Sequence, residues 1–241
     1  MPKTARLRVN TPSSVNELVI ALLQDTGMWS LNKAIDYADT VPPLLLLIVV
    51  FATVGWRRGD YAIYFIASQF FFNASATLLN ELQKDNLFVY SLNFSWSYFI
   101  LSMYFVTLYA SRTATALILG GVIVYQITSV TVMPSSVAVV AFDSLSFGAV
   151  SLLITFYCLF YYARQLSGQP NENILYNRNF WYINGIFTYY ASNFFIFLTY
   201  NTLVSRQYAD IGLIWKIHNA VFLVMCVYFF IGIRCKTLPE K

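Results

Sequence analysis

Seven apolar stretches constrain this chain more than any other feature of its sequence. They cover residues 41–56, 61–79, 87–110, 114–133, 137–163, 180–204 and 211–233. A helix needs roughly 20 mostly apolar residues to cross a hydrocarbon core of about 30 Å, because each residue advances it by about 1.5 Å. A helix also satisfies its own backbone polar groups, which lipid cannot do. The pattern predicts an all-α polytopic membrane protein with seven transmembrane helices.

The composition agrees with that prediction and excludes several partners. Hydrophobic residues make up 58% of the 241 residues and charged residues 11%, against about 25% charged in ordinary globular domains. The net charge is +4, with no basic run of the kind that follows a phosphate backbone, so we expect no nucleic-acid partner. Three separated cysteines and one histidine offer neither a disulfide framework nor a metal clip, and we expect no metal and no cofactor.

The chain divides into three parts. Residues 1–40 form an N-terminal arm, in which Ser14 and Glu17 make a capping box that opens a short amphipathic helix at 15–23, expected at the membrane interface. Residues 41–233 form the transmembrane bundle, although the first stretch spans only about 24 Å and needs a thinned bilayer or an earlier start. Residues 234–241 form a cytoplasmic tail. Because the tail is short, we expect any signal to leave through a partner protein.

Lys and Arg near the ends of the stretches predict the orientation. One side carries eight: Arg57, Arg58, Arg112, Arg164, Arg178, Arg234, Lys236 and Lys241. The other side carries four: Lys33, Lys84, Arg206 and Lys216. Lys3, Arg6 and Arg8 are distant from the first stretch, and including them would reduce the margin to eight against seven. We expect the N-terminus outside and the C-terminus in the cytoplasm.

Polar side chains gather in the outer halves of the predicted spans. At 1.5 Å per residue, Asn73, Asn93 and Asp143 each lie about 9 Å below the outer surface. Thr128 lies at about 8 Å, His218 at about 10 Å and Asn193 at about 16 Å. The inner halves of several spans carry few hydrogen-bonding side chains beyond Tyr and Thr. Because buried polar groups in a membrane face the bundle interior, we expect a cavity that opens outward.

The candidate ligand-binding residues are those of this cavity, with His218's neighbour added: Asn73, Asn93, Asp143, Asn193, His218 and Asn219. Each also has a plainer interpretation. Asp143 would cap a helix at the interface if the fifth span began later, and Asn side chains commonly join helices through hydrogen bonds. His218 is either a pH-responsive or ligand-contacting group or a hydrogen-bonded packing residue. Lys216, the other charged residue within the spans, can extend its ammonium outward to water.

Several membrane chemistries lack the residues they need. Lys216 is too near the outer end for a retinal Schiff base, a single His cannot hold a hydrolytic zinc ion, and no catalytic motif is present. We therefore expect no enzymatic activity. A transporter would show internal symmetry and helices broken by Gly or Pro, which this chain lacks. A small-solute carrier remains an alternative.

One part of the sequence resembles a known family. The segment NRNFWYINGIFTYYASNFFIF (177–197), followed by WKIHN (215–219), is similar to the end of a family of uncharacterised bacterial seven-helix proteins. Some members continue into histidine kinase domains. The family pattern in helix three contains a His and a Glu about where this chain has Ser91 and Ser97, so a function carried by those groups would be altered here.

The resemblance implies a sensory module in a bacterial inner membrane. Its small polar ligand would bind in the cavity, and it would pass a conformational change to a cytoplasmic or membrane signalling partner. A carrier or permease, or a structural membrane subunit without a ligand, are the alternatives.

Overall fold

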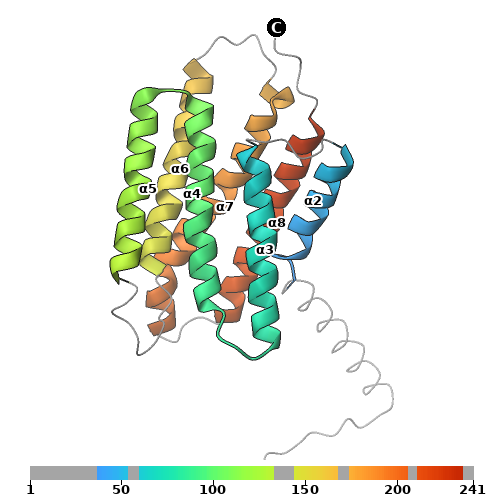
Figure 1. Ribbon diagram of the computed structural model, residues 1–241, viewed down its shortest axis with the longest axis vertical. Helices are drawn as coiled ribbons and strands as arrows, with labels where there is room; N and C mark the ends of the chain where they lie inside the picture. The colour runs from blue at the N-terminus through green and yellow to red at the C-terminus, as the bar shows by residue number, and fades with distance from the viewer. Residues whose placement is uncertain (1–36, 54–59, 133–143, 168–173, 206–210, 236–241) are drawn as a thin grey trace, which may run out of the picture.

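The computed structural model describes residues 37–53, 60–132, 144–167, 174–205 and 211–235, and every regular element in these ranges is helical (Figure 1). Its α-helices are α2 (Val41–Thr53), α3 (Tyr61–Glu81), α4 (Leu87–Tyr109), α5 (Arg112–Val132), α6 (Ser144–Ser167), α7 (Arg178–Ser205) and α8 (Ile211–Arg234). Each overlaps one predicted stretch, which confirms the all-helical prediction for these ranges. The expected helix at 15–23 lies outside the described residues.

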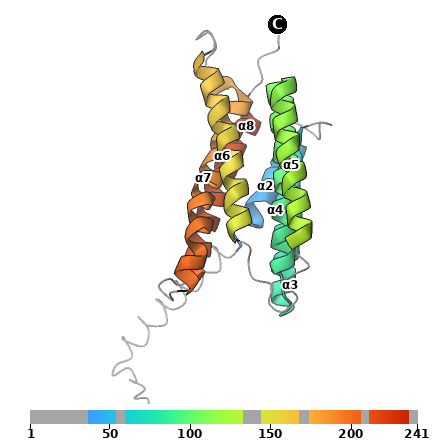
Figure 2. The same cartoon turned by 90° about the vertical axis from the view of Figure 1, so that its left-hand side faces the viewer.

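Six of these helices form a closed ring, and the seventh lies outside it. In the ring, α2 packs on α3 and α8, α3 on α4, α4 on α6, α6 on α7 and α7 on α8. Figure 2 shows α6, α7 and α8 on one side of the bundle and α3, α4 and α5 on the other. The main contact of α5 is with α4. The α3–α4 connection lies at the lower end of Figure 1, and the C-terminal end of α8 lies at the upper end.

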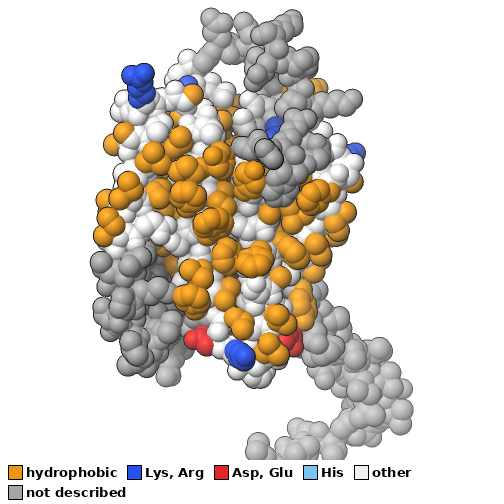
Figure 3. All heavy atoms as spheres, in the orientation of Figure 1, with side chains coloured by type: hydrophobic (Ala, Val, Ile, Leu, Met, Phe, Trp, Pro, Cys, Tyr) orange, Lys and Arg blue, Asp and Glu red, His pale blue; other side chains and the backbone are white. Residues whose placement is uncertain are grey.

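Within the described ranges, three helices are long and apolar enough to cross a membrane: α3, α6 and residues 212–234 of α8. Apolar side chains cover the face of the bundle seen in Figure 3, and the charged side chains visible there lie near its two ends. Large apolar side chains such as Phe71, Phe156 and Val227 are exposed on these three helices. In water such a surface would drive association, so it indicates contact with a lipid bilayer.

Glycine allows α7 and α8 to approach closely. A Cβ atom on Gly232 would lie 2.6 Å from Cε1 of Tyr182, and one on Gly185 would lie 3.1 Å from the Met225 carbonyl oxygen. The Tyr182 ring in turn stacks on Phe229 with centroids 4.8 Å apart. Small residues at such positions let two helix backbones meet, which is a common way to pack helices in membranes.

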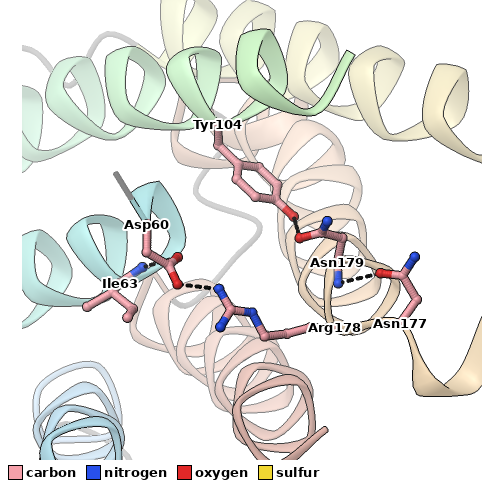
Figure 4. Close-up of polar contacts among 6 residues, drawn as sticks. All are labelled: Asp60, Ile63, Tyr104, Asn177, Arg178 and Asn179. Atoms are coloured by element: carbon pink, nitrogen blue, oxygen red, sulfur yellow. Dashed lines mark hydrogen bonds and ion pairs between the residues drawn. The ribbon is translucent and has the colours of Figure 1, made fainter. Parts of the chain in front are cut away.

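At the upper end of the bundle, an ion pair joins α3 to α7. The side chain of Asp60 accepts a bond from the Ile63 N–H, 3.4 Å away, and so caps α3. The same carboxylate pairs with the guanidinium of Arg178 (Figure 4). Beside it, the Tyr104 hydroxyl donates to Asn179 Oδ1 at 3.1 Å (Figure 4). Few hydrogen-bonding side chains beyond Tyr and Thr were predicted in this half of the bundle, and the Tyr104 hydroxyl finds its amide partner there at the start of α7.

Candidate functional site

A cavity of about 290 Å³ lies in the lower half of the bundle, where the spans were predicted to be most polar. Its wall comes from α3, α4, α7 and α8, with Phe147 of α6, Asn86 of the α3–α4 connection and the turn before α2. Asn80 and Glu81 line it and are exposed, so the cavity reaches the surface near the α3–α4 connection. Phe222 and Tyr189, both buried, line it on the inner side.

An amide cluster forms the α3–α4 part of the wall. Gln69 Nε2 donates to Asn93 Oδ1 at 3.0 Å and to Ser97 Oγ at 2.6 Å. Asn93 Nδ2 donates to Gln69 Oε1 at 3.3 Å and to Asn73 Oδ1 at 3.2 Å. Asn73 Nδ2 then donates to the backbone carbonyl of Asp39 at 2.9 Å, which ties the turn before α2 to the cluster. All four side chains of the cluster are buried.

His218 forms a second cluster across the cavity. Its Nδ1–H donates to Asn193 Oδ1 at 2.8 Å, because that oxygen can only accept. The other nitrogen, Nε2, then accepts from the Tyr189 hydroxyl, 3.2 Å away. The imidazole ring also contacts the edge of Trp215, with centroids 5.3 Å apart. Both nitrogens thus have partners that suit a neutral imidazole with its proton on Nδ1.

The structure brings together most of the predicted site residues. Asn73, Asn93, His218 and Asn219 line the cavity. Asn193 is fully buried and holds His218 without lining the cavity itself, and its Nδ2 has no hydrogen-bond partner among the described residues. Asp143 lies outside the described residues.

Thr128 does not belong to this site. Its side chain is exposed on α5, and its hydroxyl donates to the Val124 and Tyr125 carbonyls of its own helix. The depth predicted for Thr128 was close to that of Asn73. However, α5 lies outside the ring of helices that surrounds the cavity. The expectation that Thr128 contributes to a shared polar level was therefore wrong.

Several residues of the site were not identified from the sequence. Gln69 and Ser97 each lie four positions from a predicted residue, Asn73 and Asn93, and so share its helix face. That spacing could have identified both. Asp39 and Tyr189 line the cavity as well. Asp39 gave no sequence signal, since it precedes the first predicted span and reaches the site only through tertiary packing.

The cavity wall is acidic and aromatic. Asp39 is buried and Glu81 is exposed, and both line the cavity. None of the described lining residues is Lys or Arg. Tyr90 and Trp215 meet at the wall with ring centroids 5.7 Å apart. Within the described ranges no group of three His, Cys, Asp or Glu could hold a metal ion. The arrangement is suited to binding a small organic molecule.

The sequence matches no family model, and neither curated proteins nor solved structures give a significant match.

Proposed function

We propose that this chain is a seven-helix integral membrane protein that acts as a sensory module, binding a small polar ligand in the cavity and passing a conformational change to a partner protein. Its N-terminus lies outside and its C-terminus in the cytoplasm of a bacterial inner membrane. The resemblance of residues 177–197 and 215–219 to bacterial seven-helix proteins, some with histidine kinase domains, suggests the kind of partner.

The way α4 presents its side chains supports seven spans rather than three. Its Asn93 and Ser97 lower its mean hydropathy but are buried. Leu92, Trp96 and Phe99 are exposed. A helix with its polar atoms turned inward and its apolar atoms outward fits lipid better than its average composition indicates. The described Arg residues at helix ends, Arg112, Arg164, Arg178 and Arg234, belong to the side predicted to be cytoplasmic.

The observation that carries the proposal is the cavity itself. The amide cluster of α3 and α4 forms one part of its wall, and the His218 cluster of α7 and α8 forms another. A ligand between them touches both helix pairs, so its binding energy depends on how the pairs are placed relative to each other. The same two pairs meet again through Asp60 and Arg178 at the other end. A ligand-dependent shift of α3 against α7 is thereby available to a cytoplasmic partner.

The proposed role is non-catalytic. His218 is the one imidazole among the described lining residues, and those residues include no Ser or Cys that it could activate as a nucleophile. The hydroxyl of Thr77, which also lines the cavity, is instead paired with the Thr40 hydroxyl at 3.3 Å.

Spin-label distances test the proposal. One label is placed on Cys235, which follows α8, with Cys158 and Cys226 replaced by Ser or Ala. The second is placed on Ser111→Cys, which is exposed between α4 and α5 on the other side of the bundle. The reconstituted protein is then measured with and without a panel of small polar solutes. We expect at least one solute to shift the distance distribution. Thr77→Trp, which fills the cavity, should abolish the shift, whereas Leu78→Trp on the exposed face should preserve it.

The same vesicles separate the alternatives. Saturable uptake of the solute that shifts the distances would replace the sensor with a carrier. If no solute in the panel changes the distances and Thr77→Trp changes nothing measurable, the bundle is a structural subunit and the proposal fails.

A further inference from the structure

We propose that the cavity selects a small organic cation, a protonated primary amine carried on an apolar body. This inference rests on the proposed function, since it names the class of ligand that the same cavity takes. Three features of the wall support it: its charge, its hydrogen-bonding balance and its aromatic surface.

The charge of the wall favours a cation. Asp39 and Glu81 contribute two carboxylates to the lining, and none of the described lining residues is Lys or Arg. Asp39 is only 9% exposed, and its Oδ1 accepts from the Thr40 hydroxyl at 2.9 Å. A carboxylate in such a place is shielded from bulk water and attracts a positive charge more strongly than an exposed one. An anionic ligand would meet repulsion from both groups.

The amide cluster has fewer unused donors than unused acceptors. Both amide hydrogens of Gln69 and both of Asn93 are used within the cluster, and one of the two on Asn73 donates to the Asp39 carbonyl. The acceptors are less occupied, because Gln69 Oε1 and Asn73 Oδ1 each accept one bond among the described residues, and an amide oxygen has two lone pairs. A ligand that brings hydrogen-bond donors matches this surface. An ammonium group brings three and accepts none.

Aromatic rings supply the rest of the wall. Tyr90 and Trp215 lie together on one side, and Phe94, Tyr189 and Phe222 also line the cavity. The faces of such rings attract cations, and their edges and faces bury apolar groups. A volume of about 290 Å³ is enough for a ligand of roughly ten heavy atoms. The site thus fits an amine with a short hydrophobic part.

Binding of three matched probes tests the inference. Phenethylamine is cationic at neutral pH, 2-phenylethanol is its neutral analogue, and 3-phenylpropionate is an anion of similar shape. Each is titrated by calorimetry into the full chain in nanodiscs at about pH 7. We expect phenethylamine to bind at least about tenfold more tightly than either analogue, because only its charge is stabilised by the wall.

Variants of individual acidic residues then test which carboxylates contribute to binding of the amine. Asp39→Asn retains the backbone carbonyl that Asn73 uses and should weaken phenethylamine by about tenfold. Glu81→Gln, at the exposed rim, should weaken it less, and it also serves if Asp39→Asn does not fold. Asp85→Asn removes the same charge from the α3–α4 connection, where it does not line the cavity, and should leave the affinity unchanged.

The outcomes distinguish the two proposals. If the neutral or anionic probe binds as tightly as phenethylamine and Thr77→Trp blocks it, the cavity is a ligand site but the preference for cations is wrong. If no probe binds, or if Asp39→Asn and Glu81→Gln both leave the affinity for phenethylamine unchanged, the inference is overturned. The spin-label distances, measured with solutes of other classes, then decide independently whether the sensory function stands.

Discussion

The two ends of this bundle use polar side chains in opposite ways. At the lower end, the amide and His218 clusters surround a cavity that reaches the surface. At the upper end, Asp60 and Arg178 meet directly. A second, mostly apolar pocket of about 1030 Å³ lies at this end between α4, α5 and α6, but neither Asp60 nor Arg178 lines it. A polar group beside a cavity can exchange a lost partner for water, whereas one in a closed contact cannot. The loss of a polar contact should therefore destabilise the protein more at the upper end than at the lower end.

Removing the ion pair should have the largest effect on stability. The side chains of Arg178 and Asp60 are 19% and 7% exposed, so Arg178→Ala leaves a nearly buried carboxylate without its cation. We expect a loss of about 3 kcal/mol in the free energy of unfolding, measured by denaturant titration in mixed micelles. Arg234→Ala, exposed near the same end, should change it by less than about 0.5 kcal/mol. Equal effects of the two variants would show that the ion pair is not what holds this end.

Placing a larger side chain in the α7–α8 contact should have the second-largest effect on stability. Gly232→Ala places a methyl group 2.6 Å from the Tyr182 ring, which is buried and stacked on Phe229. Overpacking of this kind costs about 2 kcal/mol, which a thermal melt would detect. Gly120→Ala is the matched control, because nothing lies within 4 Å of its Cβ, and better helix propensity should make it neutral or slightly stabilising. A stable Gly232→Ala protein would mean that the two helices are less closely packed than described.

Disrupting the amide cluster should cost less than either change at the upper end. Asn93→Leu removes two hydrogen bonds with Gln69, one with Asn73 and one with Ser97, but the cavity beside them can admit water. We expect about 1 kcal/mol in the same denaturant titration. Thr128→Val, at a similar depth but exposed, should have less than half of that effect. If Asn93→Leu proves as costly as Arg178→Ala, the contrast between the two ends is wrong.

Cys235 tests which end faces the cytoplasm. A membrane-impermeant maleimide should label it in inverted vesicles and not in intact spheroplasts, and Cys235→Ser should remove the signal. Cys158 and Cys226 are buried and should not react. Partial burial raises the pKa of the Cys235 thiol, so less of it is thiolate near neutral pH, and labelling should accelerate from about pH 7 to about pH 9. Labelling in spheroplasts would reverse the orientation.

The smallest effect is expected at His218. A pH switch there would produce a change in tryptophan fluorescence between about pH 5 and about pH 8 that His218→Gln abolishes. Because both ring nitrogens already have partners suited to the neutral ring, we expect the two proteins to give the same titration. A transition present only in the unchanged protein would favour the switch over the packing role.

Sequence reasoning predicted how deep along its helix each residue of this site lies, but not whether its side chain faces the cavity. Counting residues from the span ends placed Asn73 and Asn93 at one level, and the two side chains are hydrogen-bonded. The same count placed Thr128 at that level, yet it is exposed. Distance along a helix is determined by its own residues. The side that faces inward depends on which helices pack against it, and a single sequence does not contain that information.

Other parts of the site depend on contacts between distant segments. Asp39 reaches the cavity because its backbone carbonyl accepts from Asn73, 34 positions away. Tyr189 was not among the residues predicted for the site, but α7 turns its hydroxyl toward His218 Nε2. The helices themselves were predictable, since a membrane requires each apolar stretch to satisfy its own backbone.

The glycine contacts of α7 and α8 determine how the bundle can deform. Two helices that touch at Gly185 and Gly232 cannot slide without steric clashes, so they rotate as one rigid body. Displacement is then concentrated where that body meets its neighbours, along the contacts of α8 with α2 and of α7 with α6. A molecule bound beside His218 would tilt α7 and α8 together about these contacts. The resulting displacement would be largest at Arg178, at the opposite end of α7.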